Sequence, residues 1–130
     1  IGFSLLDYSL EADFSESEKF IRKITKSVLD NGLSGGISLN VNIPKSVVGK
    51  KINGIKICRQ AKAKWIEEFD KRQNPKNNTY YWLTGKFVNK DKGEDTDEWA
   101  LNQNYISIVP VEFDLTAHHA IQELNEWNFK

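Results

Sequence analysis

The stretch Ile37-Ser38-Leu39-Asn40-Val41-Asn42-Ile43 decides the fold, because apolar residues occupy every second position in it. Strict alternation of this kind is typical of a β-strand with one buried face. Pro44 follows directly and is expected to end the strand, since proline has no N–H to donate to a neighbouring strand. The sequence therefore predicts a half-buried strand over residues 37–43.

A helix is expected before this strand. Apolar residues recur there at the three- and four-residue intervals of one helix face, namely at Phe20, Ile21, Ile24, Val28 and Leu29. Ser15, followed three residues later by Glu18, predicts a capping box, and Asp13 is an alternative cap. Gly32 is expected to end the helix, since glycine tolerates the left-handed conformation found there.

Residues 1–10 predict a short strand and its exit, so strand, helix and strand follow one another. This order is the signature of a crossover between parallel strands. We therefore assign residues 1–45 to the end of a parallel α/β sheet. Residues 46–130 differ in character and form the second part of the chain.

Extended segments dominate this second part. They are expected around residues 52–58, 80–88 and 105–113, which are rich in strand-favouring side chains. Trp65 and Phe69 lie four residues apart, a spacing that suits a helix or one face of a strand, and we favour a strand. The polar segments 70–78 and 89–98 are expected to be loops, so the strands around the first of them form a hairpin.

A last helix is predicted after Asp114 or Thr116, one of which would cap it. Its apolar stripe consists of Ala117, Ala120, Ile121, Leu124 and Trp127. Such a stripe must pack against another surface, and the rest of the chain offers little cover. A partner chain is therefore expected.

Composition limits the function classes. The 130 residues include 18 Lys and Arg against 18 Asp and Glu, and this zero net charge argues against a nucleic-acid binder. No apolar run approaches the ~20 residues that cross a bilayer, so a membrane is not expected as a partner. Cys58 is the single cysteine, which fits a reducing cytoplasmic location rather than a disulfide scaffold.

The beginning of the sequence predicts a piece of a longer protein. The chain contains no methionine and opens inside the apolar stretch Ile1-Gly2-Phe3-Ser4-Leu5-Leu6. This stretch has neither the charged region nor the cleavage pattern of a signal peptide. We interpret the chain as the C-terminal part of a longer polypeptide, and removal of a short leader is the alternative.

The histidines offer little chemistry. His118 and His119 are adjacent, so on a helix their side chains point about 100° apart and cannot grip one metal ion together. Asp114 lies four residues before His118, where its carboxylate would stabilise and orient an imidazolium. A structural cap and ion pair is the simpler interpretation of that pair.

Tyr80, Tyr81 and Trp82 are the remaining candidates for binding. They could stack on a base or a sugar, but adjacent strand residues alternate between faces, so at most two can share one. Packing within a hairpin or across an oligomer interface is the simpler interpretation. The sequence has no phosphate-binding glycine loop and no nucleophile elbow, so these residues reveal no catalytic constellation.

The chain as a whole resembles the C-terminal part of the SurE family of survival proteins, which act as nucleotidases. The resemblance is carried, in the order of the family, by residues 39–44 (LNVNIP), 54–56 (GIK), 80–85 (YYWLTG), 96–97 (TD), 99–101 (WAL), 105–110 (YISIVP) and 114–118 (DLTAH). It implies an α/β fold, namely the C-terminal part of a Rossmann-like three-layer domain with a hairpin arm and a terminal helix used for oligomerisation.

The resemblance also implies an activity. Full-length members are phosphomonoesterases that act on nucleoside 5′- and 3′-monophosphates with a divalent cation, Mg²⁺ or Mn²⁺. The motifs that hold this cation in the family are absent here, so no catalytic residue or metal ligand is expected in this chain, which alone should be inactive. The family assembles into homodimers and homotetramers. The resemblance implies that Asp114 and His118 support this assembly. Thr96 and Asp97 would border the active site.

A different class of function remains open from the residues themselves. The chain could be a non-enzymatic interaction module that uses the aromatic hairpin around Tyr80–Trp82 to bind a ligand or a partner. The residues before Ile1 in the longer polypeptide would distinguish this module from a nucleotidase.

Overall fold

A computed structural model describes residues 1–47 and 49–129. The elements follow one another as β1 (Gly2–Leu5), α1 (Ser15–Asn31), β2 (Ile37–Ile43), β3 (Ile55–Ile57), β4 (Ala63–Gln73), β5 (Thr79–Asn89), α2 (Asp97–Asn102), β6 (Ile106–Glu112) and α3 (His118–Asn125). The protein is thus an α/β fold, as the sequence predicts, and the ambiguous residues around Trp65 form a strand.

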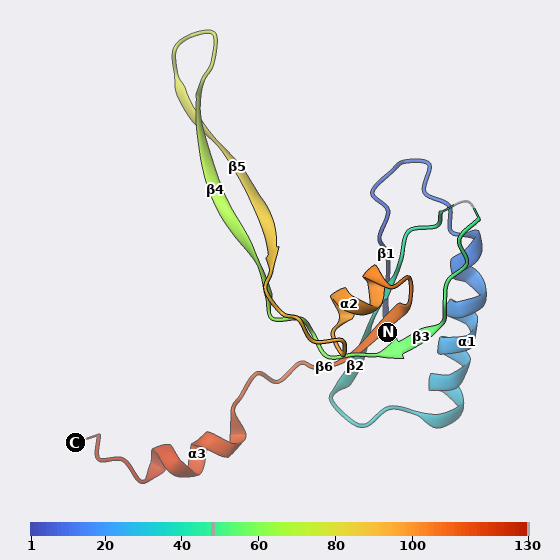
Figure 1. The fold of residues 1–130 in the computed structure, drawn as a ribbon. Helices are drawn as coiled ribbons and strands as arrows, with labels where there is room; N and C mark the ends of the chain where they lie inside the picture. The colour runs from blue at the N-terminus through green and yellow to red at the C-terminus, as the bar shows by residue number, and fades with distance from the viewer. Residues whose placement is uncertain (48, 130) are drawn as a thin grey trace.

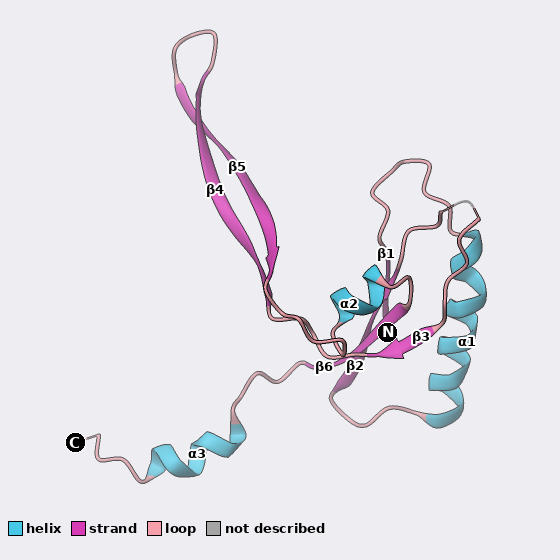
Figure 2. Cartoon of the chain, viewed as in Figure 1, coloured by secondary structure: helices cyan, strands magenta, loops and turns pink. Residues whose placement is uncertain are grey.

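One mixed sheet lies at the centre, with the strand order β1-β2-β6-β3 (Figure 2). β1 and β2 are parallel and are connected through α1, which confirms the predicted crossover. β2 pairs antiparallel with β6, and β3 pairs parallel with the other edge of β6. The second part of the chain therefore extends the sheet that the first part begins.

The main core lies between this sheet and α1. The alternation of β2 turns Val41 and Ile43 inward, where they are 0% and 2% exposed. They pack with Ile24 of α1 and with Ile106 and Ile108 of β6. Full burial of each such side chain stabilises the fold by roughly 1.5–3 kcal/mol.

A smaller cluster occupies the opposite face of the sheet. Cys58, Ala100 of α2 and Val109 of β6 are buried there, with Trp99 and Tyr105 packed against them. Figure 1 shows α1 and α2 on opposite sides of the sheet. Burial raises the pKa of the Cys58 thiol, so this cysteine is an inert part of the packing.

β4 and β5 form a separate two-stranded hairpin that projects far from the sheet (Figure 1). Ala63 pairs with Asn89 at its base and Gln73 with Thr79 near its tip. β4 extends into the predicted loop 70–78, since residues up to Gln73 are paired with β5. We call this hairpin the arm.

Arg59 fastens the base of the arm to the body of the protein. Its guanidinium binds both carboxylate oxygens of Asp91, at 2.6 and 3.0 Å, and its Nε donates to Asp95 at 2.9 Å. Asp91 also accepts the backbone N–H groups of Lys62 and Gly93. These bonds hold the pKa of the Asp91 carboxyl well below its usual range, with Arg59 as the main cause. We call this group the Arg59 clasp.

Three local predictions are wrong. Ser15 and Glu18 form no capping box, because Glu18 instead accepts two hydrogen bonds from Arg22, and the N–H of Ser15 binds Asp13. The charged segment 89–98 is a loop only between its ends, since β5 includes Asn89, α2 begins at Asp97, and the Arg59 clasp orders the residues between them. No side chain caps α3, which begins at His118 after Ala117.

Gly93 gives a direct test of the clasp. A Cβ on this glycine would overlap Nη2 of Arg59 and Oδ1 of Asp95, so Gly93→Ala has to displace the guanidinium or the Asp95 carboxylate and so loosen the clasp. We expect Gly93→Ala to lower Tm by about 3–8 °C and to speed amide exchange at Lys62.

Gly35→Ala is the matched control, because a Cβ there meets nothing within 4 Å. It should leave Tm and the exchange of Lys62 close to those of the parent chain. Equal Tm values for the two variants would contradict a structural role for the clasp.

Candidate functional site

Thr96 and Asp97, expected to border an active site, lie where the arm meets α2. The Thr96 hydroxyl donates to the carbonyl of Gly93 and accepts from the N–H of Trp99, which caps α2. Oδ1 of Asp97 accepts the backbone N–H groups of Ala61 and of the next residue. Both side chains are thus engaged in holding the backbone, and their place beside an active site stays a prediction.

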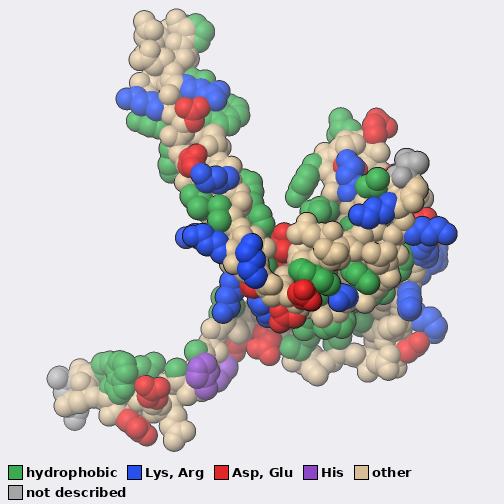
Figure 3. All heavy atoms as spheres, in the orientation of Figure 1, with side chains coloured by type: hydrophobic (Ala, Val, Ile, Leu, Met, Phe, Trp, Pro, Cys, Tyr) green, Lys and Arg blue, Asp and Glu red, His purple; other side chains and the backbone are tan. Residues whose placement is uncertain are grey.

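One face of the arm carries five large apolar side chains, with Glu67 and Lys71 between them. The register places Trp65 opposite Phe87 and Phe69 opposite Leu83, and Tyr81 continues the same face. All five side chains are exposed, and hydrophobic side chains follow the arm in Figure 3. We call these five residues the apolar face of the arm. Exposed apolar patches of this kind mark interaction sites.

Gly85 shapes this face. A Cβ on Gly85 would overlap Nε1 of Trp65, so the indole lies across the space that the glycine leaves. The Trp65 ring also packs against Phe87, with 6.5 Å between the ring centroids. The apolar face is therefore a shaped surface rather than a row of independent side chains.

The aromatic triplet 80–82 is divided between the two faces, as alternation predicts. Tyr80 and Trp82 lie on the face opposite Tyr81, paired with Arg72 and Asp70. Arg72 binds Asp70 at 2.7 Å and lies 5.7 Å from the centroid of the Trp82 ring. The three rings therefore form no single stacking platform.

Asp114 and His118 are brought together at the start of α3. Nε2 of His118 lies 2.8 Å from Oδ2 of Asp114, and Oδ1 accepts the N–H of Thr116. The Thr116 side chain, then His118 and the Thr116 N–H, lower the pKa of the Asp114 carboxyl to about 2. The pair fixes the turn into α3, which lies apart from the sheet in Figure 1.

α3 and the residues around it expose further large apolar side chains. Leu115 is 95% exposed, Phe129 76% and Trp127 56%, and the last two rings lie 6.0 Å apart. Ile121 and Leu124 lie on the same helix and are also exposed. The predicted apolar stripe is present but is not covered by the described part of the chain.

The acidic, histidine and cysteine side chains of the described residues are not clustered in the way that commonly holds a metal ion. These residues contain no group of three or more His, Cys, Asp or Glu side chains placed to hold a metal ion. Asp91 and Asp95 both bind the guanidinium of Arg59.

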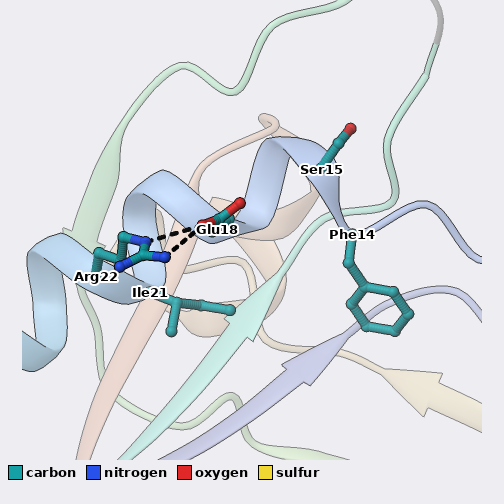
Figure 4. A pocket seen from close by; sticks show the side chains of 5 residues that line it. All are labelled: Phe14, Ser15, Glu18, Ile21 and Arg22. Carbon is teal, nitrogen blue, oxygen red and sulfur yellow. Dashed lines mark hydrogen bonds and ion pairs between the residues drawn. The ribbon is translucent and has the colours of Figure 1, made fainter.

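A hollow of about 510 Å³ lies at the start of α1, lined by Phe14, Ser15, Glu18, Ile21 and Arg22 (Figure 4). Two of the polar side chains, Glu18 and Arg22, bind each other. The rest of the lining consists of Phe14, Ile21 and Ser15, so the only charged groups in the hollow are this ion pair.

Sequence reasoning missed Arg59 and its partners Asp91 and Asp95. The partners lie 32 and 36 residues further along the chain, so no local spacing reveals them. It also missed α2, although Thr96 before two acidic residues is a recognisable helix start. In the described residues, none of the helices is both long and apolar enough to cross a membrane.

Comparison with known proteins identifies relatives of about twice this length. A 5′-nucleotidase SurE from Christiangramia forsetii is 66% identical over 128 residues, covering 98% of this chain and 49% of that protein. One from Phocaeicola vulgatus is 42% identical over 131 residues, covering 100% of this chain and 50% of that protein. The chain spans about half the length of the curated relatives it matches.

A solved structure has the same fold. The crystal structure of the SurE protein from Aquifex aeolicus matches with a TM-score of 0.75 at 31% identity, covering 95% of this chain and 49% of that one. The family model described as survival protein SurE matches residues 1–67. Since that match spans more than half of the 130 residues, the chain belongs to the SurE family.

Proposed function

We propose that this chain is the C-terminal part of a nucleotidase that hydrolyses nucleoside 5′- and 3′-monophosphates to nucleoside and phosphate. The observation that carries the proposal is the 66% identity to a protein named 5′-nucleotidase SurE over 98% of this chain. The chain supplies the end of the sheet, the arm and α3, and we place the enzyme in the cytoplasm.

The proposed reaction uses a divalent cation, Mg²⁺ or Mn²⁺, which would polarise the phosphoryl oxygen. Its ligands belong to the half of the polypeptide outside these 130 residues. This assignment is supported by the engagement of Asp91, Asp95 and Asp97 in hydrogen bonds of the clasp and the α2 start.

Phosphate release tests the activity. We expect no phosphate release from AMP or from a 3′-monophosphate by the 130-residue chain alone, with Mg²⁺ or Mn²⁺ present. The polypeptide extended to the length of the relatives should release phosphate, and EDTA should abolish this. Hydrolysis by the 130 residues alone would contradict our placement of the metal ligands. An inactive extended protein would favour a non-enzymatic module that binds through the arm.

We further propose that the arm and α3 assemble the protein into a homodimer or homotetramer. Two exposed apolar surfaces support this, namely the apolar face of the arm and the stripe of α3. A two-stranded hairpin is marginally stable by itself, and packing against a second copy would cover its apolar face. Closed symmetric assembly would use the same patch on each subunit.

Leu83→Asp tests which face of the arm is used. Leu83 is 60% exposed on the apolar face, so a carboxylate there should weaken self-association by at least about tenfold. Tyr80→Asp is the control, because Tyr80 lies on the opposite face, beside Arg72. Sedimentation equilibrium at micromolar concentration measures both. A purely monomeric parent chain, or equal loss in both variants, would refute this use of the arm.

Asp114 gives a test of the pair at the start of α3. Because its pKa is lowered from 3.8 to about 2, its contribution to ordering the turn is complete above about pH 4 and is lost as pH falls through 2. Thr116→Val and His118→Ala should each raise the midpoint of the Asp114 carboxyl signal in an NMR titration, Thr116→Val by more. The Asp91 signal, governed by Arg59, is the control. A midpoint near 3.8 in the parent chain would show that the pair does not form.

A further inference from the structure

A row of polar side chains crosses the sheet on the face opposite α1. The register aligns Ser4 of β1 with Asn42 of β2, Asn42 with Ser107 of β6, and Ser107 with Lys56 of β3. The neighbours of Ser4, Asn42 and Ser107, and Ile55 before Lys56, belong to the core on the α1 side, so alternation turns these four side chains to the other side. Every strand of the sheet contributes one member. We call this set the polar row.

No side chain of the polar row has a hydrogen-bond partner among the described residues. Ser4 is exposed and Asn42 half-buried, so both can bind water. Ser107 is 0% exposed and its Oγ is without a partner, which is costly because the hydroxyl has given up water without a replacement. The Ser107 hydroxyl, in the middle of the row, therefore lacks the hydrogen-bond partner that a buried hydroxyl normally has.

Lys56 adds a positive charge to the same row. Its Nζ lies 4.4 Å from the centroid of the Trp99 ring and 5.1 Å from that of Tyr105. Rings hold an ammonium through their negative faces but accept no strong hydrogen bond from it. No carboxylate in the described part of the chain lies within ion-pair distance of Lys56, so its charge and its three N–H donors are available.

The position of the row also suits a ligand. Ser4 and Asn42 each lie one residue before the end of a parallel strand, β1 and β2. Ligands of open α/β sheets bind at the carboxyl ends of such strands. The row spans four strands, on the order of 14 Å from first to last.

We propose that the polar row, Ser4, Asn42, Ser107 and Lys56, is a binding site for a phosphate oxyanion. An ammonium, an amide and two hydroxyls can all donate hydrogen bonds, and a phosphate group offers several oxygen acceptors to a mixed set of this kind. The inference rests on the proposed nucleotidase function only for the identity of its ligand. A phosphate monoester is the substrate of that reaction and free phosphate is its product.

An NMR titration of the 130-residue chain tests the site. Inorganic phosphate and, separately, AMP are added at constant ionic strength set with chloride. We expect both to shift the side-chain amide of Asn42 and the backbone amides of Lys56 and Ser107. Shifts with phosphate alone would assign the site to the product, and shifts with AMP alone would overturn the proposal, since the nucleoside would then be the recognised part.

Lys56→Gln should weaken phosphate binding by about tenfold or more, because a charge-assisted bond is lost. Lys86→Gln is the matched control, since Lys86 lies on the arm beside Glu68. If Lys56→Gln does not fold, Ser4→Ala at the exposed end of the row is used instead. This variant should also weaken phosphate binding.

Equal phosphate affinity in the parent chain and in the row variants would overturn the proposal, as would shifts confined to lysines of the arm. The row would then be a contact surface for another polypeptide segment. Phosphate release by the extended protein is measured separately. Intact hydrolysis with no binding at the row would refute this site and leave the proposed function standing.

Discussion

The alternation of β2 is the constraint on which the rest of the structure depends. This strand lies between β1 and β6, so its side chains determine what both faces of the sheet present. Val41 and Ile43 fill the core beneath α1, while Asn40 and Asn42 point to the other side. A register shift by one residue would bury the asparagines and expose the core.

The second organising interaction lies where the arm leaves the body. Arg59 follows β3 closely, and its partners Asp91 and Asp95 follow β5, so one guanidinium joins the chain entering the arm to the chain leaving it. The backbone N–H of Arg59 also binds the carbonyl of Asp95. A planar, bidentate donor suits this place better than a lysine, because it fixes direction as well as distance.

Local patterns predicted the elements whose periodicity faces the core. Residues 37–43 and the helix before them belong to this class. The strand around Trp65 was also predicted, although it lies on the arm, where Trp65 and Phe69 are exposed. The Arg59 clasp could not be predicted, because its partners are distant in sequence. The predicted capping box does not form because Glu18 binds Arg22, one turn later in the helix, instead of the backbone at the helix start. The pairing of Asp114 with His118 was predicted from spacing and is formed, although α3 begins only at His118.

The length of the arm has a consequence for the newly made chain. β4 and β5 each have an outer edge without a neighbouring strand in the described structure, and such edges invite pairing with other molecules. Glu68, Asp70 and Lys86 interrupt the hydrophobic side chains on one face and act as gatekeepers against fibre-like stacking. In a newly made chain these open edges and exposed apolar side chains are features that chaperones and proteases recognise.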